Sequence, residues 1–252
     1  MKTAHDQISG RQTQLTTEQG RSGLLSTTQK RSLVIVGAGE FAKIADEYFT
    51  KDSDYHVVAF AVESTFKTAE TVNDKPLVAI EDLTVLFPPD NFSVHIAITY
   101  TELNTVRERI FKKLKSLGYK FANYISSNAF VWDNVEIGEN VFIFEANVVQ
   151  PFCTIGDCVV LWSGNHIGHR TQIKSGVYVS SHVVISGYCQ IGERCFIGVN
   201  TAFADHVTIA EDNFVAMASV VTTNMLDPDR VIKGSPATAT KISAKRLMKA
   251  RP

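Results

Sequence analysis

Every sixth residue from Ile125 to Val221 is apolar. All seventeen positions of this series follow the rule, and Phe203 is the one member that is not aliphatic. A repeat of constant length over such a long stretch is typical of a solenoid, in which each unit packs against its neighbours. A period of six residues predicts one particular solenoid, the parallel β-helix.

The repeat also predicts which residues are neighbours in space. Three hexads make one triangular coil of 18 residues, and coils stack at the spacing of β-strands, about 4.8 Å. Two residues that are 18 positions apart therefore lie beside each other on one face. Seventeen hexads give slightly fewer than six coils, and no insertion interrupts them.

The residues before the repeat have a different pattern, in which short apolar runs alternate with segments of helical periodicity. We expect a strand that ends in the turn Gly37–Gly39, a helix over 40–49, strands over 56–62 and 94–98, and a helix over 103–117 that Gly118 terminates. This alternation indicates a small parallel α/β unit, Rossmann-like, over residues 32–120.

The β-helix then extends over residues 121–226, and residues 227–252 follow as a turn and a short basic helix. We expect the turn over 231–237 and the helix over 241–249. Because no Gly/Ser-rich linker separates the α/β unit from the first coil, we expect a rigid junction.

Composition and charge exclude several classes of protein. The net charge of −1 gives no basic field for nucleic acid, and no apolar run reaches the length of a membrane span. Residues 1–31 are rich in Gln, Thr, Ser and Arg and lack the apolar segment of a signal peptide. We therefore expect a disordered tail and a cytoplasmic protein.

The four cysteines do not form a CxxC pair. Cys153, Cys189 and Cys195 stand four residues after an aliphatic position, where other hexads have small side chains, and Cys158 is the fourth. This spacing favours buried structural thiols over metal ligands. His166, His169 and His206 likewise lack the spacing of a three-histidine zinc site, so we expect no metal.

The densest polar cluster is the segment from Ser163 to Arg170. Within it, His169 follows the inward-facing Ile167 by two positions and points outward at a corner. One coil later the sequence has Gly187, so the stacking places a backbone N–H beside an imidazole. Such a pair could supply a general base and an oxyanion donor.

Two further features suit phosphate groups. The loop Gly37-Ala38-Gly39-Glu40 follows a strand and precedes a helix, where a nucleotide phosphate can bind the helix N-terminus, although a plain tight turn explains the glycines equally well. Near the C-terminus, Lys233 and Lys241 with their basic neighbours form a positive patch, which is either a solvated surface or a phosphate site.

An α/β unit that begins VGAGEFAK and leads directly into hexapeptide repeats resembles the NeuD/PglD-type bacterial sugar acyltransferases. The resemblance covers about residues 32–240 and includes the stretch Trp162-Ser163-Gly164 up to His169, which is similar to the family's N-T-G-x-x-x-x-H. This chain has Trp162 where the family has asparagine, and Arg170 where the family has an acidic residue.

The resemblance implies a homotrimer of left-handed β-helices with acetyl-CoA in the groove between two neighbours. It implies that His169 is the catalytic base and that the Gly187 amide holds the thioester oxygen. The nucleotide would rest on the α/β unit. The expected substrate-binding residues are Gly37, Gly39, Glu40, Glu63, Asn165 and His166, and those expected to bind acetyl-CoA are Tyr178, Asp205, Lys233, Gly234, Ser235 and Lys241.

The resulting hypothesis is an acetyl-CoA-dependent N-acetyltransferase that acts on the amino group of a nucleotide-linked amino sugar for surface polysaccharide. Two alternatives stay open. One is a sugar O-acetyltransferase, and the other is a non-catalytic β-helix that serves as a scaffold.

Overall fold

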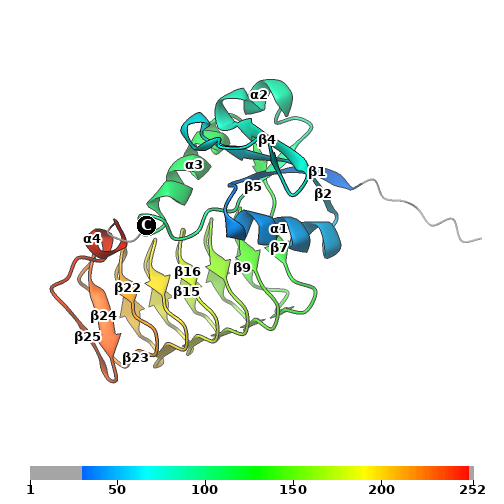
Figure 1. The fold of residues 1–252 in the computed structure, drawn as a ribbon. Helices are drawn as coiled ribbons and strands as arrows, with labels where there is room; N and C mark the ends of the chain where they lie inside the picture. Colours follow the sequence, from blue (N-terminus) through cyan, green and yellow to red (C-terminus); the bar gives the residue numbers. More distant parts are fainter. Residues whose placement is uncertain (1–29, 250–252) are drawn as a thin grey trace, which may run out of the picture.

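The computed structural model describes residues 30–249. The predicted tail, residues 1–31, lies outside this range except for its last two residues, and Arg31 begins the first strand. The chain builds an α/β unit that is mounted on one side of a long spiral of strands (Figure 1).

The spiral consists of seventeen strands of two residues each, and every strand ends on a position of the six-residue series. The predicted parallel β-helix is thereby confirmed, coil by coil. The strands are β7 (Tyr124–Ile125), β8 (Phe130–Val131), β9 (Glu136–Ile137), β10 (Phe142–Ile143), β11 (Val148–Val149), β12 (Thr154–Ile155), β13 (Val160–Leu161), β14 (His166–Ile167), β15 (Gln172–Ile173), β16 (Tyr178–Val179), β17 (Val184–Ile185), β18 (Gln190–Ile191), β19 (Phe196–Ile197), β20 (Ala202–Phe203), β21 (Thr208–Ile209), β22 (Phe214–Val215) and β23 (Val220–Val221).

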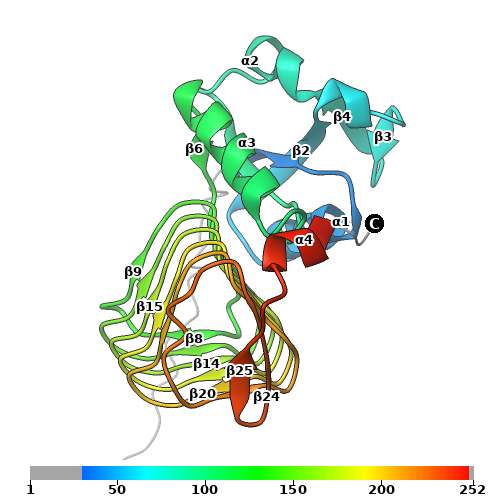
Figure 2. The ribbon, with the colours of Figure 1, turned by 90° about the vertical axis from the view of Figure 1, so that its left-hand side faces the viewer.

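Strands three apart in this series pair in parallel and form three flat sheets, which are the sides of a triangular prism (Figure 2). We name one sheet after its contact with the α/β unit and the other two after the polarity of their own outward side chains. The junction sheet runs β7-β10-β13-β16-β19-β22, the apolar sheet runs β8-β11-β14-β17-β20-β23, and the polar sheet runs β9-β12-β15-β18-β21. Partners are 18 residues apart, as in the pair His166 and Val184.

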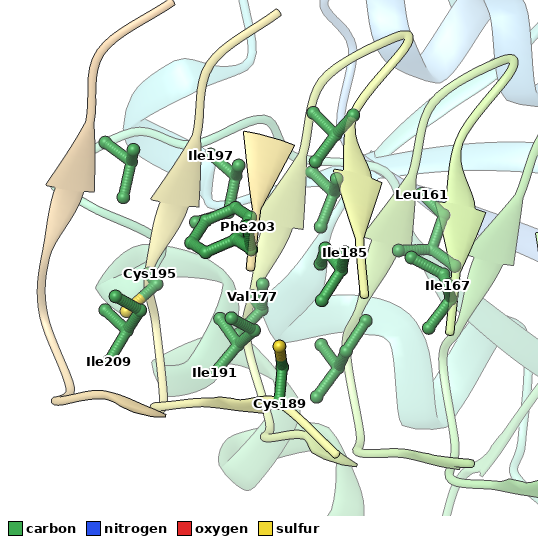
Figure 3. Packing of buried hydrophobic residues seen from close by; sticks show 14 of the residues in the cluster. Leu161, Ile167, Val177, Ile185, Cys189, Ile191, Cys195, Ile197, Phe203 and Ile209 are labelled. Atoms are coloured by element: carbon green, nitrogen blue, oxygen red, sulfur yellow. The ribbon is translucent and has the colours of Figure 1, made fainter. Parts of the chain in front are cut away.

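The inside of the prism is filled by the aliphatic series, whose side chains stack along the axis (Figure 3). Cys153, Cys189 and Cys195 point into the same core and are at most 1% exposed, which confirms them as buried thiols. Burial raises the pKa of Cys195 to about 12, so this thiol stays protonated at neutral pH.

The α/β unit has a six-stranded sheet in the order β3-β4-β2-β1-β5-β6. Apart from the edge strand β3, which pairs antiparallel, all its strands are parallel, and their order is that of a doubly wound sheet. Its elements are β1 (Arg31–Val36), α1 (Glu40–Lys51), β2 (Tyr55–Val62), η1 (Ser64–Phe66), β3 (Thr71–Val72), β4 (Lys75–Ala79), η2 (Ile80–Asp82), α2 (Leu83–Leu86), β5 (Ser93–Ile96), α3 (Thr105–Ser116) and β6 (Lys120–Phe121).

The predicted elements of this unit are present with ends within two residues of the prediction. β5 ends two residues before position 98, and α3 begins two residues later than position 103. The reason is the backbone, since Glu102, Leu103 and Asn104 have φ angles of 51°, 52° and 65°. Three successive left-handed residues are incompatible with a right-handed helix, so the helix starts after them. Gly118, with φ 88°, follows the helix and ends it as predicted.

The α/β unit packs on the junction sheet through aromatic side chains. Phe41 and Phe49 of α1 contact the outward-facing Phe142, with ring centroids 5.4 and 5.9 Å apart. Arg107 of α3 is fully buried at this interface and donates hydrogen bonds to the carbonyl oxygens of Cys158 and Gly176, 3.1 and 3.0 Å away. The predicted direct junction is therefore a packed interface.

The C-terminal segment extends the junction sheet. Where we predicted a turn over 231–237, the structure has a hairpin of β24 (Val231–Gly234) and β25 (Ala237–Ala239), with β24 paired to β22. The helix α4 (Ala244–Lys249) starts three residues after the predicted position 241, because the Ser243 hydroxyl accepts a hydrogen bond from the Arg246 amide and caps the first turn. No helix within residues 30–249 combines the length and apolarity that crossing a bilayer requires.

Candidate active site

His169 lies in the turn between β14 and β15, at the corner where the apolar sheet meets the polar sheet. Its side chain is exposed, and the next coil places Gly187 directly beside it. A Cβ atom at Gly187 would lie 2.6 Å from Cε1 and 2.9 Å from Nε2 of the imidazole. The ring thus lies against the backbone of Gly187, in a space that a larger residue would occupy.

The imidazole has a hydrogen-bonding partner on its other side. Gln150, one residue after β11 in the preceding coil, accepts a hydrogen bond from the His169 backbone amide at 2.8 Å. The same Oε1 lies 3.3 Å from Nδ1 of the ring. Nδ1 and Nε2 lie at nearly equal distances, 3.0 and 2.9 Å, from the position of a Cβ atom at Gly187, so the edge of the ring at Cε1 faces this glycine.

The Gly187 amide already has a hydrogen-bond acceptor within the chain. It donates a hydrogen bond of 3.1 Å to Oδ1 of Asp205, an exposed residue of the following coil. Asp205 was predicted to contact the cofactor, and here it occupies the donor that was predicted to hold the thioester oxygen. A substrate carbonyl can take this amide only when the carboxylate moves aside.

Three aromatic side chains and one guanidinium are stacked along the same corner, and the sequence analysis did not predict them. We call it the aromatic corner: Phe152, Arg170, Tyr188 and His206, each 18 residues after the one before. The Arg170 guanidinium lies 4.5 Å from the Phe152 ring centroid, and Tyr188 stacks on His206 at 4.7 Å. The rings of His169 and Tyr188 make a T-shaped contact, with centroids 5.1 Å apart. The spacing of 18 was the signal that could have found this set.

The structure does not bring two of the predicted residues to this corner. Asn165 is 1% exposed, and its side chain bonds the Trp162 carbonyl and the Val183 amide inside the coil. Tyr178 is 4% exposed and stacks on Phe196 in the junction interface. Both side chains are used for packing, so they leave the set of candidate ligand contacts.

The remaining predicted residues of the β-helix lie on two different sides. His166 points outward from the apolar sheet and is half-buried. Lys233, Gly234 and Ser235 belong to the exposed hairpin at the end of the junction sheet, and Lys241 follows it on the surface. A single chain does not place this basic hairpin at the corner of His169.

A second candidate site lies in the α/β unit. A cavity of about 220 Å³ opens where the sheet order reverses, between the carboxyl ends of β1 and β5. Ligands of doubly wound sheets bind at this point. Gly37, Ala38, Glu63, Phe66 and Thr101 are among its lining residues.

The backbone conformation and the close approach of Ala97 require a glycine at position 37. Its φ is 136°, and a Cβ atom would lie 2.6 Å from the carbonyl oxygen of Ala97. Gly39 caps α1 outside the lining of the cavity, and the neighbouring Glu40 side chain is 81% exposed. The loop therefore brings the backbones that follow β1 and β5 close together, and its Glu40 carboxylate is turned to solvent.

Glu63 is held in place by Arg109. The guanidinium donates to both carboxylate oxygens, at 2.7 and 2.8 Å, and this pairing holds the pKa of Glu63 below its usual range. Glu63 thus presents a fixed negative group in a cavity whose other lining residues are mostly apolar.

The two candidate sites do not face each other within one chain. The α/β unit covers the junction sheet, whereas His169 lies at the corner opposite that sheet. Figure 2 shows the α/β unit on one side of the prism and the strands β14 and β15 on the two other sides. Across residues 30–249, no three His, Cys, Asp or Glu side chains gather closely enough to hold a metal ion.

Taken together, fold and site define a class: an α/β unit docked on a hexapeptide-repeat β-helix that carries an imidazole–glycine pair at one corner. Solved structures of this architecture exist, and their likeness to the chain confirms the fold-level resemblance to sugar acyltransferases.

The acetyltransferase domain of PglB from Neisseria gonorrhoeae aligns with a TM-score of 0.75 and 23% identity, over 84% of this chain and all of that domain. PerB from Caulobacter crescentus, solved with CoA and GDP-perosamine, aligns with a TM-score of 0.74 and 24% identity, over 83% of this chain and 97% of PerB. At these identities the likeness concerns the fold.

Among curated proteins, the UDP-3-O-acylglucosamine N-acyltransferase of Bordetella avium is 33% identical over 100 residues. The alignment covers 40% of this chain and 27% of that protein, so the chain matches only about a quarter of the length of this relative. No family model matches the sequence.

Proposed function

We propose that this protein is an acetyl-CoA-dependent N-acetyltransferase that modifies the amino group of a nucleotide-linked amino sugar, in the synthesis of lipopolysaccharide or another surface polysaccharide. The observation that carries the proposal is the imidazole of His169 against the backbone of Gly187, at an open corner of the β-helix. Support comes from the shared fold of PerB, which was solved with CoA and GDP-perosamine.

Each part of the chain has a role in this proposal. Residues 32–120 form a Rossmann-like domain that holds the nucleotide sugar in the cavity at Gly37 and Glu63. Residues 121–226 form a left-handed β-helix that transfers the acetyl group, and residues 227–252 provide the basic hairpin and helix for the phosphates of CoA. The four unpaired cysteines suit the reducing cytoplasm, where we place the reaction.

The functional unit in this proposal is a homotrimer, with the apolar sheet turned toward the partner copies. Phe130, Val184 and Val220 of this sheet are 57%, 46% and 38% exposed. The polar sheet instead presents Glu, Thr and Gln at equivalent outward positions. Burying the apolar sheet between copies would make a groove at each corner that carries His169, and the α/β unit of a neighbouring copy would complete it.

The chemistry follows from the position of the two groups. His169 removes a proton from the sugar amine as the nitrogen attacks the thioester carbonyl, and the negative charge collects on the carbonyl oxygen. The Gly187 amide stabilises that oxygen after Asp205 moves aside, and the imidazolium then protonates the departing thiolate. A positioned base contributes about 10²–10⁴ in rate, and one oxyanion donor about 10²–10³.

The test is turnover of His169→Asn, measured as thiol release from acetyl-CoA with a panel of nucleotide-linked amino sugars. We expect kcat to fall at least about a hundredfold, with the oligomeric state and acetyl-CoA binding unchanged. His56→Asn, which changes an exposed histidine of the α/β unit, is the control with normal turnover. Near-normal kcat in His169→Asn would contradict the proposal.

The same assay separates amine from hydroxyl acceptors. Analogues in which a hydroxyl replaces the amino group should release no thiol if nitrogen is the nucleophile. Thiol release from the hydroxyl analogue alone would instead support the sugar O-acetyltransferase.

A further inference from the structure

The environment of the His169 ring has a feature that the proposed function leaves unexplained. Its Nδ1 side faces an uncharged amide, that of Gln150, and the residue that follows it is the cationic Arg170. A histidine base in an enzyme is ordinarily oriented through the ring nitrogen that does not touch the substrate, often by a carboxylate. Here that place is taken by a glutamine from the preceding coil.

The orientation of the glutamine amide is determined by the backbone. The His169 N–H donates to Gln150 at 2.8 Å, and an N–H can only be accepted by the amide oxygen, not by the NH₂ group. The oxygen therefore faces His169. Because this oxygen has no proton to give, the 3.3 Å contact to Nδ1 is a hydrogen bond only when Nδ1 carries the proton.

We propose that Gln150 is the positioning residue that holds His169 as the Nδ1–H tautomer, which leaves the Nε2 lone pair free to act as the base. The inference rests on the proposed function for its catalytic meaning, but the tautomer itself is a property of the free protein. In this tautomer Nε2 is the basic nitrogen of the ring, the atom that would take the proton of an incoming amine.

The other groups around the ring do not compete for Nδ1. The Asp205 carboxylate is bonded to the Gly187 amide, and the Arg170 guanidinium lies over the Phe152 ring. Tyr188 makes a T-shaped contact with the imidazole and stacks in turn on His206. Among the described residues, Gln150 is thus the hydrogen-bond partner of the His169 ring.

The direct test is the tautomer, measured by ¹⁵N NMR of histidine-labelled protein at pH 8.5, where an imidazole is ordinarily neutral. The His169 signal is assigned by its loss in His169→Asn. We expect a protonated Nδ1 in the wild type and in Gln150→Glu, which keeps an oxygen acceptor. In Gln150→Leu we expect the signal of a mixed or Nε2–H population.

The kinetic test uses the same variants. Gln150→Leu should lower kcat about ten- to a hundredfold while KM for acetyl-CoA stays within about twofold, because the base is misdirected but the groove is intact. Gln150→Glu should retain most of the activity. Gln190→Leu, an exposed glutamine of the polar sheet, is the matched control.

The outcomes separate this inference from the proposed function. If Gln150→Leu keeps both the tautomer and kcat, the inference is wrong even when the enzyme is active. If no acceptor is acetylated, the NMR result still decides whether Gln150 sets the tautomer. Should Gln150→Leu fold poorly, Gln150→Ala removes the same oxygen with a smaller side chain.

Discussion

At the scale of single residues, the chain places polar groups in surroundings that determine their state of protonation. His95 of β5 is the clearest case, since it is 1% exposed and packed among the rings of Phe49 and Phe142. Nδ1 bonds the carbonyl oxygen of Ala122 at 2.9 Å, and Nε2 has no hydrogen-bond partner among the described residues. Burial lowers the pKa of His95 to about 4.

This shift predicts how stability depends on pH. The unfolded chain binds a proton at His95 below about pH 6.5, but the folded chain does so only below about pH 4, so the free energy of unfolding decreases as the pH falls through this window. The loss amounts to about 3 kcal/mol at most. Denaturant titrations at pH 7, 5.5 and 4 should show this slope, and His95→Phe should reduce it.

Gly187 gives a second prediction at this scale. In Gly187→Ala the new methyl group would meet Cε1 of His169 at 2.6 Å, so the ring must turn away from its position. Turnover should fall at least about tenfold, since misplacing a base by a fraction of an ångström removes much of its effect. Ser186→Ala, the adjacent residue, is the control. Normal turnover of Gly187→Ala would show that the ring position is not needed.

At the scale of elements, the six-residue period was sufficient to predict every coil, because the inward position of each hexad has one requirement, an apolar side chain. Phe203 is the one ring in this series and is 2% exposed. Adjacent hexads have aliphatic residues, so the core around it is adjusted to one large side chain.

Phe203→Ala should therefore leave a cavity that the stacked coils cannot close. We expect a destabilisation of about 3–5 kcal/mol, and a smaller one for Phe203→Leu. Leu226→Ala, at a position that is 65% exposed, is the control with little change. The measurement is the free energy of unfolding in denaturant. Equal stability of Phe203→Ala and Leu226→Ala would contradict the described packing.

The six-residue period could not predict the side-chain contacts at the corners of the β-helix or the structure outside it. Gln150 is 19 residues before His169, not 18, and periodicity does not tell which way a polar side chain turns in a corner. The start of α3 depends on the left-handed residues 102–104, and the hairpin at 231–239 depends on pairing with β22. Arg107 was missed because the carbonyl groups that receive it come from segments far apart in the chain.

At the scale of the whole molecule, the arrangement separates the two candidate sites. The cavity belongs to the α/β unit, which packs on the junction sheet, and His169 lies at the opposite corner of the same prism. If both take part in one reaction, they must come from different copies of the chain. The proposed trimer provides this arrangement.

Mixed trimers test it. His169→Asn removes the base, and Thr101→Trp obstructs the cavity, so each variant alone should be inactive. Co-expressed in equal amounts with different tags, they should recover about a quarter of the wild-type activity, because a groove then draws its two parts from two chains at random. Activity that stays at the level of the single variants would show that one chain supplies both parts.

The hydrogen bond from the Gly187 amide to Asp205 affects whether this amide stabilises the bound substrate or the transition state. In the proposed mechanism, a neutral carbonyl that enters must compete with a carboxylate for one proton donor, and a carboxylate is the stronger acceptor. As the carbonyl oxygen gains negative charge, it becomes as strong a hydrogen-bond acceptor as the carboxylate. The amide would then change partner mainly along the path to the tetrahedral species, so its help would go to the transition state more than to the bound substrate.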